Sequence, residues 1–140
     1  MSNEHRRHPR YASDLPVAIA FGEVLASESS YLSNISAGGV AFSALVELKP
    51  GTVIMLQLPP DRPVLRTPVR VVWCHPMAQH YSVGAEFLSK DMAFRERIVE
   101  MVQQVDSYCA EVVRAGRNMS TQEALAEWIE LFGKDFFGAR

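Results

Sequence analysis

The sequence has few cysteines and no long apolar segment, and both features narrow the kinds of protein it can be. Only two cysteines, Cys74 and Cys109, occur among 140 residues, and they lack the Cys-x-x-Cys spacing of zinc and redox sites. We expect both to be free thiols, buried or half-buried in the core. No apolar run reaches the roughly 18 residues of a membrane span, and no apolar stretch follows the charged N-terminus as in a secretory signal. We therefore expect a soluble, cytoplasmic protein.

Excess charge of one sign is also missing. Lys and Arg number 14 against 16 Asp and Glu, for a formal net charge of -2. Nucleic-acid binding needs a basic surface, so we expect neither DNA nor RNA as a partner. Against this background, residues 6–11 (RRHPRY) form a local basic cluster with Arg6, Arg7 and Arg10. Taken alone, such a cluster is typical of a solvated tail or of an arm that enters the DNA minor groove.

Catalytic and metal-binding patterns are equally sparse. The four histidines are scattered, and the sequence contains neither a motif that places a Ser/His/Asp set nor a Gly-x-x-x-x-Gly-Lys loop, so we do not expect an enzyme. His75 and His80 flank a predicted hairpin turn. A metal pair there is conceivable, but a solvated loop is favoured because two ligands are too few for a metal site. We expect no metal and no cofactor.

Alternation of apolar residues predicts a mainly β protein. With 48% hydrophobic and 21% charged residues, the chain has the composition of one globular domain with an appendage. Leu15, Val17, Ile19 and Phe21 share one face of an extended segment. Further strands are predicted through Tyr31 and over residues 40–44, 52–58, 64–74 and 81–88. About six short strands without intervening helices favour a small antiparallel barrel or sandwich.

After residue 88 the apolar period changes to that of a helix, about 3.5 residues. The predicted helix begins near Ser89 or Asp91 and aligns six residues on one stripe: Phe94, Ile98, Met101, Val105, Tyr108 and Val112. We expect this stripe to pack across the mouth of the barrel. A partner helix would also suit it.

A second helix is predicted from the capping box Ser120-Thr-Gln-Glu123. Its apolar side includes Leu125 and Trp128, and the pair Phe136–Phe137 follows. This much apolar surface predicts docking, either on the same domain or on a second copy. A homodimer through the C-terminal helices is therefore one of the expected arrangements.

Two polar clusters near strand ends predict a ligand site. Arg6 and Arg10 precede the first strand, and Asn34, Ser36 and Gly39 form Asn-x-Ser-x-x-Gly before a later one. In a small antiparallel barrel, two such segments can lie side by side. A guanidinium pairs with phosphate oxygens or with the O6 and N7 edge of guanine. Asn and Ser offer hydrogen-bonding groups to a base, and glycine lets backbone amides approach an anion. The combination suits a guanine nucleotide.

Together the clusters resemble the paired signature of PilZ domains, bacterial receptors for cyclic di-GMP. Arg6-x-x-x-Arg10 and Asn34-x-Ser36-x-x-Gly39 are both complete, with Asn at a position where the family pattern admits Asp or Asn. Residues 69–87 (VRVVWCHP…YSVGAEF) also resemble the closing strands of that domain. The resemblance covers roughly residues 5–112, so residues 116–140 fall outside it.

The resemblance implies a six-stranded antiparallel β-barrel with C-terminal α-helices. The expected parts are a mobile basic arm (1–12), the barrel with its following helix (13–113) and a helical extension (116–140). Cyclic di-GMP would lie on the outer surface of the barrel, with the arm folded over it. Arg6 and Arg10 would engage guanine edges and phosphates, Asn34 and Ser36 would hold the other side of the base, and Gly39 would permit close approach.

Three further residues belong to this prediction. Arg7 would add a phosphate contact, and Gly84 would offer a flat floor in the last strand. Trp73 shares its parity with Val69 and Val71, which favours a core position over a stacking role.

The implied function is that of a cyclic di-GMP receptor in a bacterial second-messenger pathway, with a protein partner that reads the bound state. Residues 1–10 carry little apolar surface, so we expect them to be mobile without ligand and ordered by it. The alternative is a scaffold that binds no ligand and acts through protein contacts of its C-terminal helices.

Overall fold

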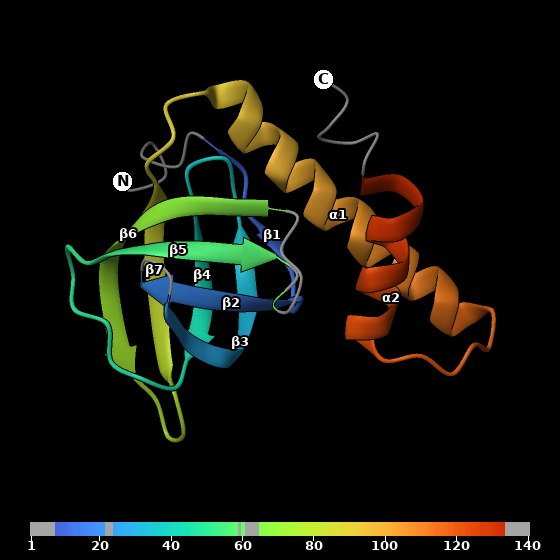
Figure 1. The fold of residues 1–140 in the computed structure, drawn as a ribbon, viewed down its shortest axis with the longest axis horizontal. Helices are drawn as coiled ribbons and strands as arrows, with labels where there is room; N and C mark the ends of the chain where they lie inside the picture. Colours follow the sequence, from blue (N-terminus) through green and yellow to red (C-terminus); the bar gives the residue numbers. More distant parts are fainter. Residues whose placement is uncertain (1–7, 22–23, 59, 61–64, 134–140) are drawn as a thin grey trace.

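Antiparallel strands followed by helices make up the part of the chain that the computed structural model describes, residues 8–21, 24–58, 60 and 65–133 (Figure 1). The strands are β1 (Tyr11–Ala12), β2 (Pro16–Phe21), β3 (Val24–Ile35), β4 (Gly39–Ala44), β5 (Val53–Leu58), β6 (Leu65–Pro76) and β7 (Tyr81–Phe87). The helices are α1 (Met92–Arg114) and α2 (Thr121–Trp128), which continues into a π-helical turn, Ile129–Gly133.

Six of the strands close into a barrel. Their order is β3-β2-β5-β6-β7-β4, and β4 pairs back onto β3. Closure leaves these six strands without a free edge for unwanted pairing. The short β1 adds to β3 as a seventh strand. The predicted fold, a six-stranded antiparallel barrel with C-terminal helices, is confirmed.

The barrel core follows from the period-two pattern of the strands. Val17 and Ile19 of β2 are fully buried, as are Phe42 of β4 and Val83 of β7. Burial of one such side chain contributes about 1.5–3 kcal/mol. The alternate positions face the outside of the barrel, where Ser43 of β4 and Ser82 of β7 are partly exposed, whereas Ala18 of β2 is also fully buried.

Helix α1 packs its apolar stripe against the barrel. Asp91 caps it by accepting a hydrogen bond from the Phe94 backbone N–H at 3.2 Å. Ile98, Met101 and Val105 are completely buried in the same hydrophobic cluster as the barrel interior. In Figure 1 the helix leaves β7 and runs across one end of the barrel. The predicted packing of this stripe on the barrel is therefore confirmed.

A second contact joins α1 to the chain just before β2. The Ser13 side chain hydrogen-bonds to Asp106 of α1. Burial raises the pKa of Asp106, the hydrogen bond from Ser13 partly offsets this rise, and the nearby Asp14 charge adds to it. The segment that leads out of β1 thus lies directly against α1.

Helix α2 docks on α1 of its own chain. The predicted capping box is present, with the Ser120 hydroxyl and the Glu123 carboxylate each bonded to the other's backbone N–H. Leu125 and Trp128 are buried in the common core. Phe136 and Phe137 lie outside the described residues.

Two smaller expectations concern the thiols and the arm. Cys74 and Cys109 are free and half-buried, as predicted. Tyr11 and Ala12, which the sequence analysis assigns to the arm, pair with Ile35 and Asn34 as β1. Within the described ranges, no helix is long and apolar enough to cross a membrane.

Candidate functional site on the outer barrel face

The N-terminal segment lies against the turn that carries the Asn-x-Ser-x-x-Gly motif. Arg10 Nη1 donates a hydrogen bond to Asn34 Oδ1 at 3.1 Å. A Cβ placed on Gly38 would lie 3.3 Å from the ring of His8. The structure therefore brings Arg10 and His8 next to the second motif, although residues 1–7, with Arg6 and Arg7, lie outside the described residues.

The motif turn itself is held by short hydrogen bonds. The Ser36 N–H donates to the Gly39 carbonyl at 2.9 Å, and Ser36 Oγ accepts the Gly38 N–H at 3.1 Å. Ser36 is only 8% exposed. Its side-chain oxygen organises the turn, and its hydroxyl proton is a further donor.

Gly39 is required by strand packing. A Cβ at this position would collide with the carbonyl oxygen of Ala85 on the paired strand β7. The glycine thus lets β4 and β7 approach each other directly after the turn.

Small side chains occupy the outer positions of β4 and β7. The register pairs Ala41 with Gly84 and Ser43 with Ser82. Since successive side chains point to opposite faces, and the intervening Phe42 points into the core, these four residues share the outer face. We call Ala41, Ser43, Ser82 and Gly84 the floor.

Larger polar and aromatic side chains stand on both sides of the floor. On β3, Asn34 pairs with Ala41 and carries the hydrogen bond from Arg10. On β6, Trp73 pairs with Gly84 and His75 with Ser82. The register therefore runs across the surface as Asn34, Ala41, Gly84 and Trp73.

Two more groups border the same face. Tyr31 donates its backbone N–H to Ser43 Oγ at 3.2 Å, and its side chain is half exposed. Glu86 pairs in register with Gly39 and forms an ion pair of 3.1 Å with Arg70 of β6. The outer barrel face is thus a floor of small residues bordered by aromatic and charged ones.

The position of Trp73 corrects the expectation from its parity. The predicted core position is wrong because the register shifts between Val71 and Trp73. After this irregularity, Cys74 packs against the core, and the indole lies over Gly84 on the outer face. A Cβ on Gly84 would collide with the indole, so the glycine makes room for it.

The ring of Trp73 is stacked with that of His75, with centroids 4.9 Å apart and planes inclined by 23°. His75 lies one residue before the end of β6 and His80 directly precedes β7, so the two histidines flank the hairpin turn as predicted, and both are exposed. Among the described residues, no group of three or more His, Cys, Asp or Glu side chains is placed to hold a metal ion.

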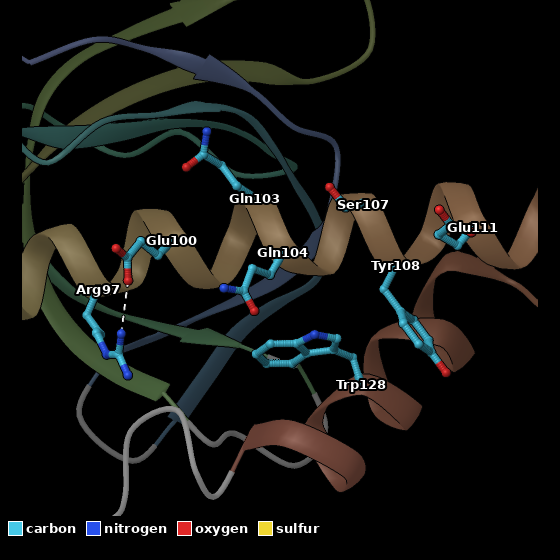
Figure 2. Close-up of a pocket in the computed structure, with 8 residues that line it drawn as sticks. All are labelled: Arg97, Glu100, Gln103, Gln104, Ser107, Tyr108, Glu111 and Trp128. Carbon is cyan, nitrogen blue, oxygen red and sulfur yellow. Dashed lines mark hydrogen bonds and ion pairs between the residues drawn. The ribbon is translucent and has the colours of Figure 1, made fainter.

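A second polar hollow, of about 740 Å³, lies between α1 and α2 (Figure 2). It is lined by Arg97, Glu100, Gln103, Gln104, Ser107, Tyr108, Glu111 and Trp128. Arg97 is paired with Glu100 at 3.0 Å, drawn as a dashed line in Figure 2. The three charged side chains of the lining already have partners, since Glu111 pairs with Arg114 besides the Arg97–Glu100 pair. Sequence reasoning did not single out the hollow.

A small hydrogen-bond network joins the two helices beside this hollow. Tyr108 donates its hydroxyl to Glu127 at 2.7 Å, and Arg117 donates to the same carboxylate at 3.2 Å. The Arg117 and Tyr108 hydrogen bonds lower the pKa of Glu127, and the bond to Glu127 raises that of Tyr108. The network therefore holds α2 in place.

Comparison with known proteins identifies the family of the chain. The family model of the PilZ domain matches residues 4–104, which is more than half of the chain. The chain belongs to the PilZ domain family. No curated protein sequence matches it.

Solved structures share the fold at low sequence identity. The inhibitor of motility MotI/DgrA from Bacillus subtilis is 19% identical with a TM-score of 0.53, covering 72% of this chain and 51% of that one. YcgR from Escherichia coli in complex with c-di-GMP is 15% identical with a TM-score of 0.55, covering 80% and 50%. The PilZ domain of YcgR with c-di-GMP is also 15% identical with a TM-score of 0.55, covering 76% and 97%. The chain thus spans about half the length of the first two proteins.

Proposed function

We propose that this protein is a receptor for cyclic di-GMP, acting in a bacterial second-messenger pathway, and that the ligand lies on the outer barrel face. One observation carries the proposal: Arg10 is 3.1 Å from Asn34, which joins the two halves of the PilZ signature at the edge of the floor. Structures of similar fold are described as complexes with c-di-GMP, which supports the same ligand.

The described signature residues have donors to offer the ligand. Arg10 uses one of its five N–H donors on Asn34, so others are available to a phosphate or a guanine edge. Asn34 accepts this bond through Oδ1, which leaves its amide N–H groups for the base. Ser36 contributes a hydroxyl proton beside them. Arg6 and Arg7 would add charge from the preceding residues.

The two glycines of the site matter because they have no side chain, and not because they contact the ligand. Gly39 keeps the motif turn close to β7, and Gly84 keeps the floor low where Trp73 lies over it. A planar base approaching the face would meet the partly exposed Ser43 and Ser82 and the indole that covers Gly84, because Ala41 is only 4% exposed. In this proposal, both glycines shape the surface on which the ligand lies.

Ligand binding would order the arm. His8 lies beside Gly38, so the chain that precedes it joins the barrel next to the second motif, and Arg6 and Arg7 would close over the bound ligand. A ligand with two phosphates would neutralise the arginines and favour the closed arm. Binding should weaken as salt rises, because screening reduces the attraction between the arginines and the phosphates.

A protein partner would read the bound state. Leu131 and Phe132, in the turn after α2, are exposed apolar residues, and the Phe132 ring contacts those of Tyr108 and Trp128, which line the hollow. This surface also favours the second candidate function, a scaffold that works through its C-terminal helices. The two functions are compatible, since they use different faces.

Isothermal titration calorimetry with cyclic di-GMP tests the proposal, with GTP and cyclic di-AMP as competing ligands. We expect saturable binding of cyclic di-GMP alone. The Arg6→Ala/Arg10→Ala variant should lose at least tenfold in affinity, because a hydrogen bond to a charged group contributes about 1.5–3 kcal/mol.

Arg114→Ala is the matched control, because Arg114 is an exposed arginine on α1 that pairs with the neighbouring Glu111. It should bind like the wild type. Equal binding of GTP, or full affinity in the double variant, would contradict the proposal.

A further inference from the structure

Helix α1 carries an exposed polar stripe that the proposed function does not use. Arg97, Glu100, Gln104, Ser107 and Glu111 are all exposed, and all of them line the hollow between α1 and α2 (Figure 2). They alternate steps of three and four residues, which is the spacing of a helix seam that faces another helix. We propose that α1 of a second copy of this chain packs antiparallel along this stripe. The inference goes beyond the proposed function, since it concerns a different face.

The order of charges along the stripe makes it complementary to itself. Arg97 and Glu111 lie at its two ends, and the uncharged Gln104 lies midway between them. A twofold axis at Gln104 therefore places Arg97 against Glu111 of the second copy, and Glu111 against Arg97 of the second copy. The symmetry repeats each contact, so each dimer gains two pairs of opposite charge.

The same charges disfavour other arrangements of the two helices. Parallel helices in register would place Arg97 against Arg97 and Glu111 against Glu111. Antiparallel helices shifted by three residues would place Arg97 against Arg114 and Glu100 against Glu111. Like charges that meet across an interface suppress such pairings. Of these three arrangements, the antiparallel one centred on Gln104 brings opposite charges together at both ends.

The ion pairs within one chain leave these charges available for exchange. Arg97 pairs with Glu100 at 3.0 Å and Glu111 with Arg114 at 2.7 Å, and 46–70% of each of these side chains is exposed. Exposed pairs three residues apart on a helix contribute little to stability, so little is lost when the charges pair across an interface instead. Glu100 would then lie near the Ser107 hydroxyl of the second copy, which can donate a hydrogen bond.

An aromatic wall beside the stripe supplies the apolar part of the interface. Trp128 and Tyr108 line the hollow, and the Phe132 ring contacts both of their rings. Phe132 is nevertheless 45% exposed. A second α1 would cover this ring and occupy the space of about 740 Å³ beside it. Aromatic side chains are enriched at the centres of interfaces, and two α1–α2 pairs would together form an antiparallel four-helix arrangement.

Sedimentation velocity of the full chain over a range of concentrations tests the inference. We expect the wild type to pass from monomer to dimer as its concentration rises, and the dimer to weaken as salt rises. Arg97→Glu and Glu111→Arg should each weaken the dimer at least about tenfold, because either reversal turns two attractive contacts into two repulsive ones.

Charge exchange separates this interface from a general effect of the substitutions. The Arg97→Glu/Glu111→Arg double variant has opposite charges at both contacts again, and so does the heterodimer that forms when the two single variants are mixed. Both should dimerise within a few fold of the wild type. Failure of the double variant to recover would overturn the antiparallel arrangement.

Glu47→Arg is the matched control, because it changes the net charge by the same amount as Glu111→Arg. Glu47 is an exposed glutamate between β4 and β5, outside both helices. Its reversal should leave the dimer unchanged. A loss equal to that of Glu111→Arg would show an effect of net charge alone and would overturn the interface.

Titration of the same variants with cyclic di-GMP separates this inference from the receptor function. The α1 reversals should bind the ligand like the wild type, because the stripe and the signature residues lie on different elements. A wild type that stays monomeric up to about 1 mM would overturn the interface and leave the receptor function intact. So would a dimer that neither reversal weakens.

Discussion

The outer barrel face and the hollow between α1 and α2 are both polar surfaces, but they are assembled differently. The barrel face brings together residues from distant parts of the chain, such as Arg10, Asn34 and Trp73 on three different segments. The hollow is lined mostly by successive turns of one helix. Side chains that come from distant segments, as on the barrel face, can surround a shared space. Side chains on one face of a helix, as in the hollow, lie beside each other.

The charges of the two regions differ in the same way. In and beside the hollow, Arg97 pairs with Glu100 and Arg114 with Glu111, each pair three residues apart on α1. Exposed pairs of this kind contribute little to stability, and in each pair the two opposite charges neutralise each other. On the barrel face, Arg10 hydrogen-bonds to a neutral amide, so this contact places no opposite charge beside it. The candidate ligand site thus differs from the hollow in that side chains from several strands converge around a floor of small residues. Polarity alone does not distinguish the two regions.

The largest effect on stability should come from Gly39→Ala, a substitution in the barrel. The added Cβ would overlap the Ala85 carbonyl, and neither backbone can move without breaking the pairing of β4 with β7. We expect the free energy of unfolding to fall by about 1–3 kcal/mol or more, measured by urea denaturation.

Gly38→Ala is the neighbouring control. Among the described residues, its added Cβ would meet the ring of His8 at 3.3 Å and Ser36 Oγ at 3.6 Å and no backbone atom within 4 Å. Because the His8 side chain can rotate away, the loss should stay below about 0.5 kcal/mol. Equal losses at the two glycines would contradict the packing role assigned to Gly39.

Glu127→Gln, a substitution in α2, should have a smaller effect, limited to the stability of that helix. The carboxylate accepts hydrogen bonds from Tyr108 and Arg117, so its replacement should loosen α2 while cyclic di-GMP affinity stays unchanged. Hydrogen exchange of the α2 amides measures the loosening. Glu111→Gln, which removes an exposed pair on α1, should leave α2 protection as it is.

The pH dependence of α2 protection follows from the same contact. The pKa of Glu127 is lowered in the folded protein by Arg117 and then by Tyr108. Its stabilising contribution is therefore complete above the usual pKa of an unfolded glutamate and is lost as the pH falls through the lowered value. Wild-type α2 should lose protection on acidification over that range, and Glu127→Gln should not. Identical pH profiles would show that Glu127 does not hold the helix.

Features that depend on local chemistry were predicted from the sequence. The alternation at Val17 and Ile19 marks a half-buried strand, and Ser120 with Glu123 marks a helix start, because neither signal requires knowledge of distant residues. The stripe from Phe94 to Val112 likewise predicted the packed face of α1. Barrel closure could be inferred only from the number of strands and from the family resemblance.

Features that depend on register were not predictable. A one-residue irregularity between Val71 and Trp73 reverses the faces that follow it, so the parity of Trp73 pointed to the wrong side. The pairing of Tyr11 and Ala12 with β3 is also long-range, and the sequence of these two residues alone does not predict a strand. The signature motifs allowed candidate site residues to be predicted from the sequence. The floor and the β6 residues beside it could be found only from the strand register.

Nuclear magnetic resonance mapping of cyclic di-GMP on the isotope-labelled protein locates the ligand directly. We expect the largest shift changes at the Ser36–Gly39 turn, at Gly84 and at the indole N–H of Trp73. The amides of α2 should change little. Shift changes concentrated at Gln104, Tyr108 and Trp128, with the barrel face unaffected, would contradict the account and move the ligand to the hollow between the helices.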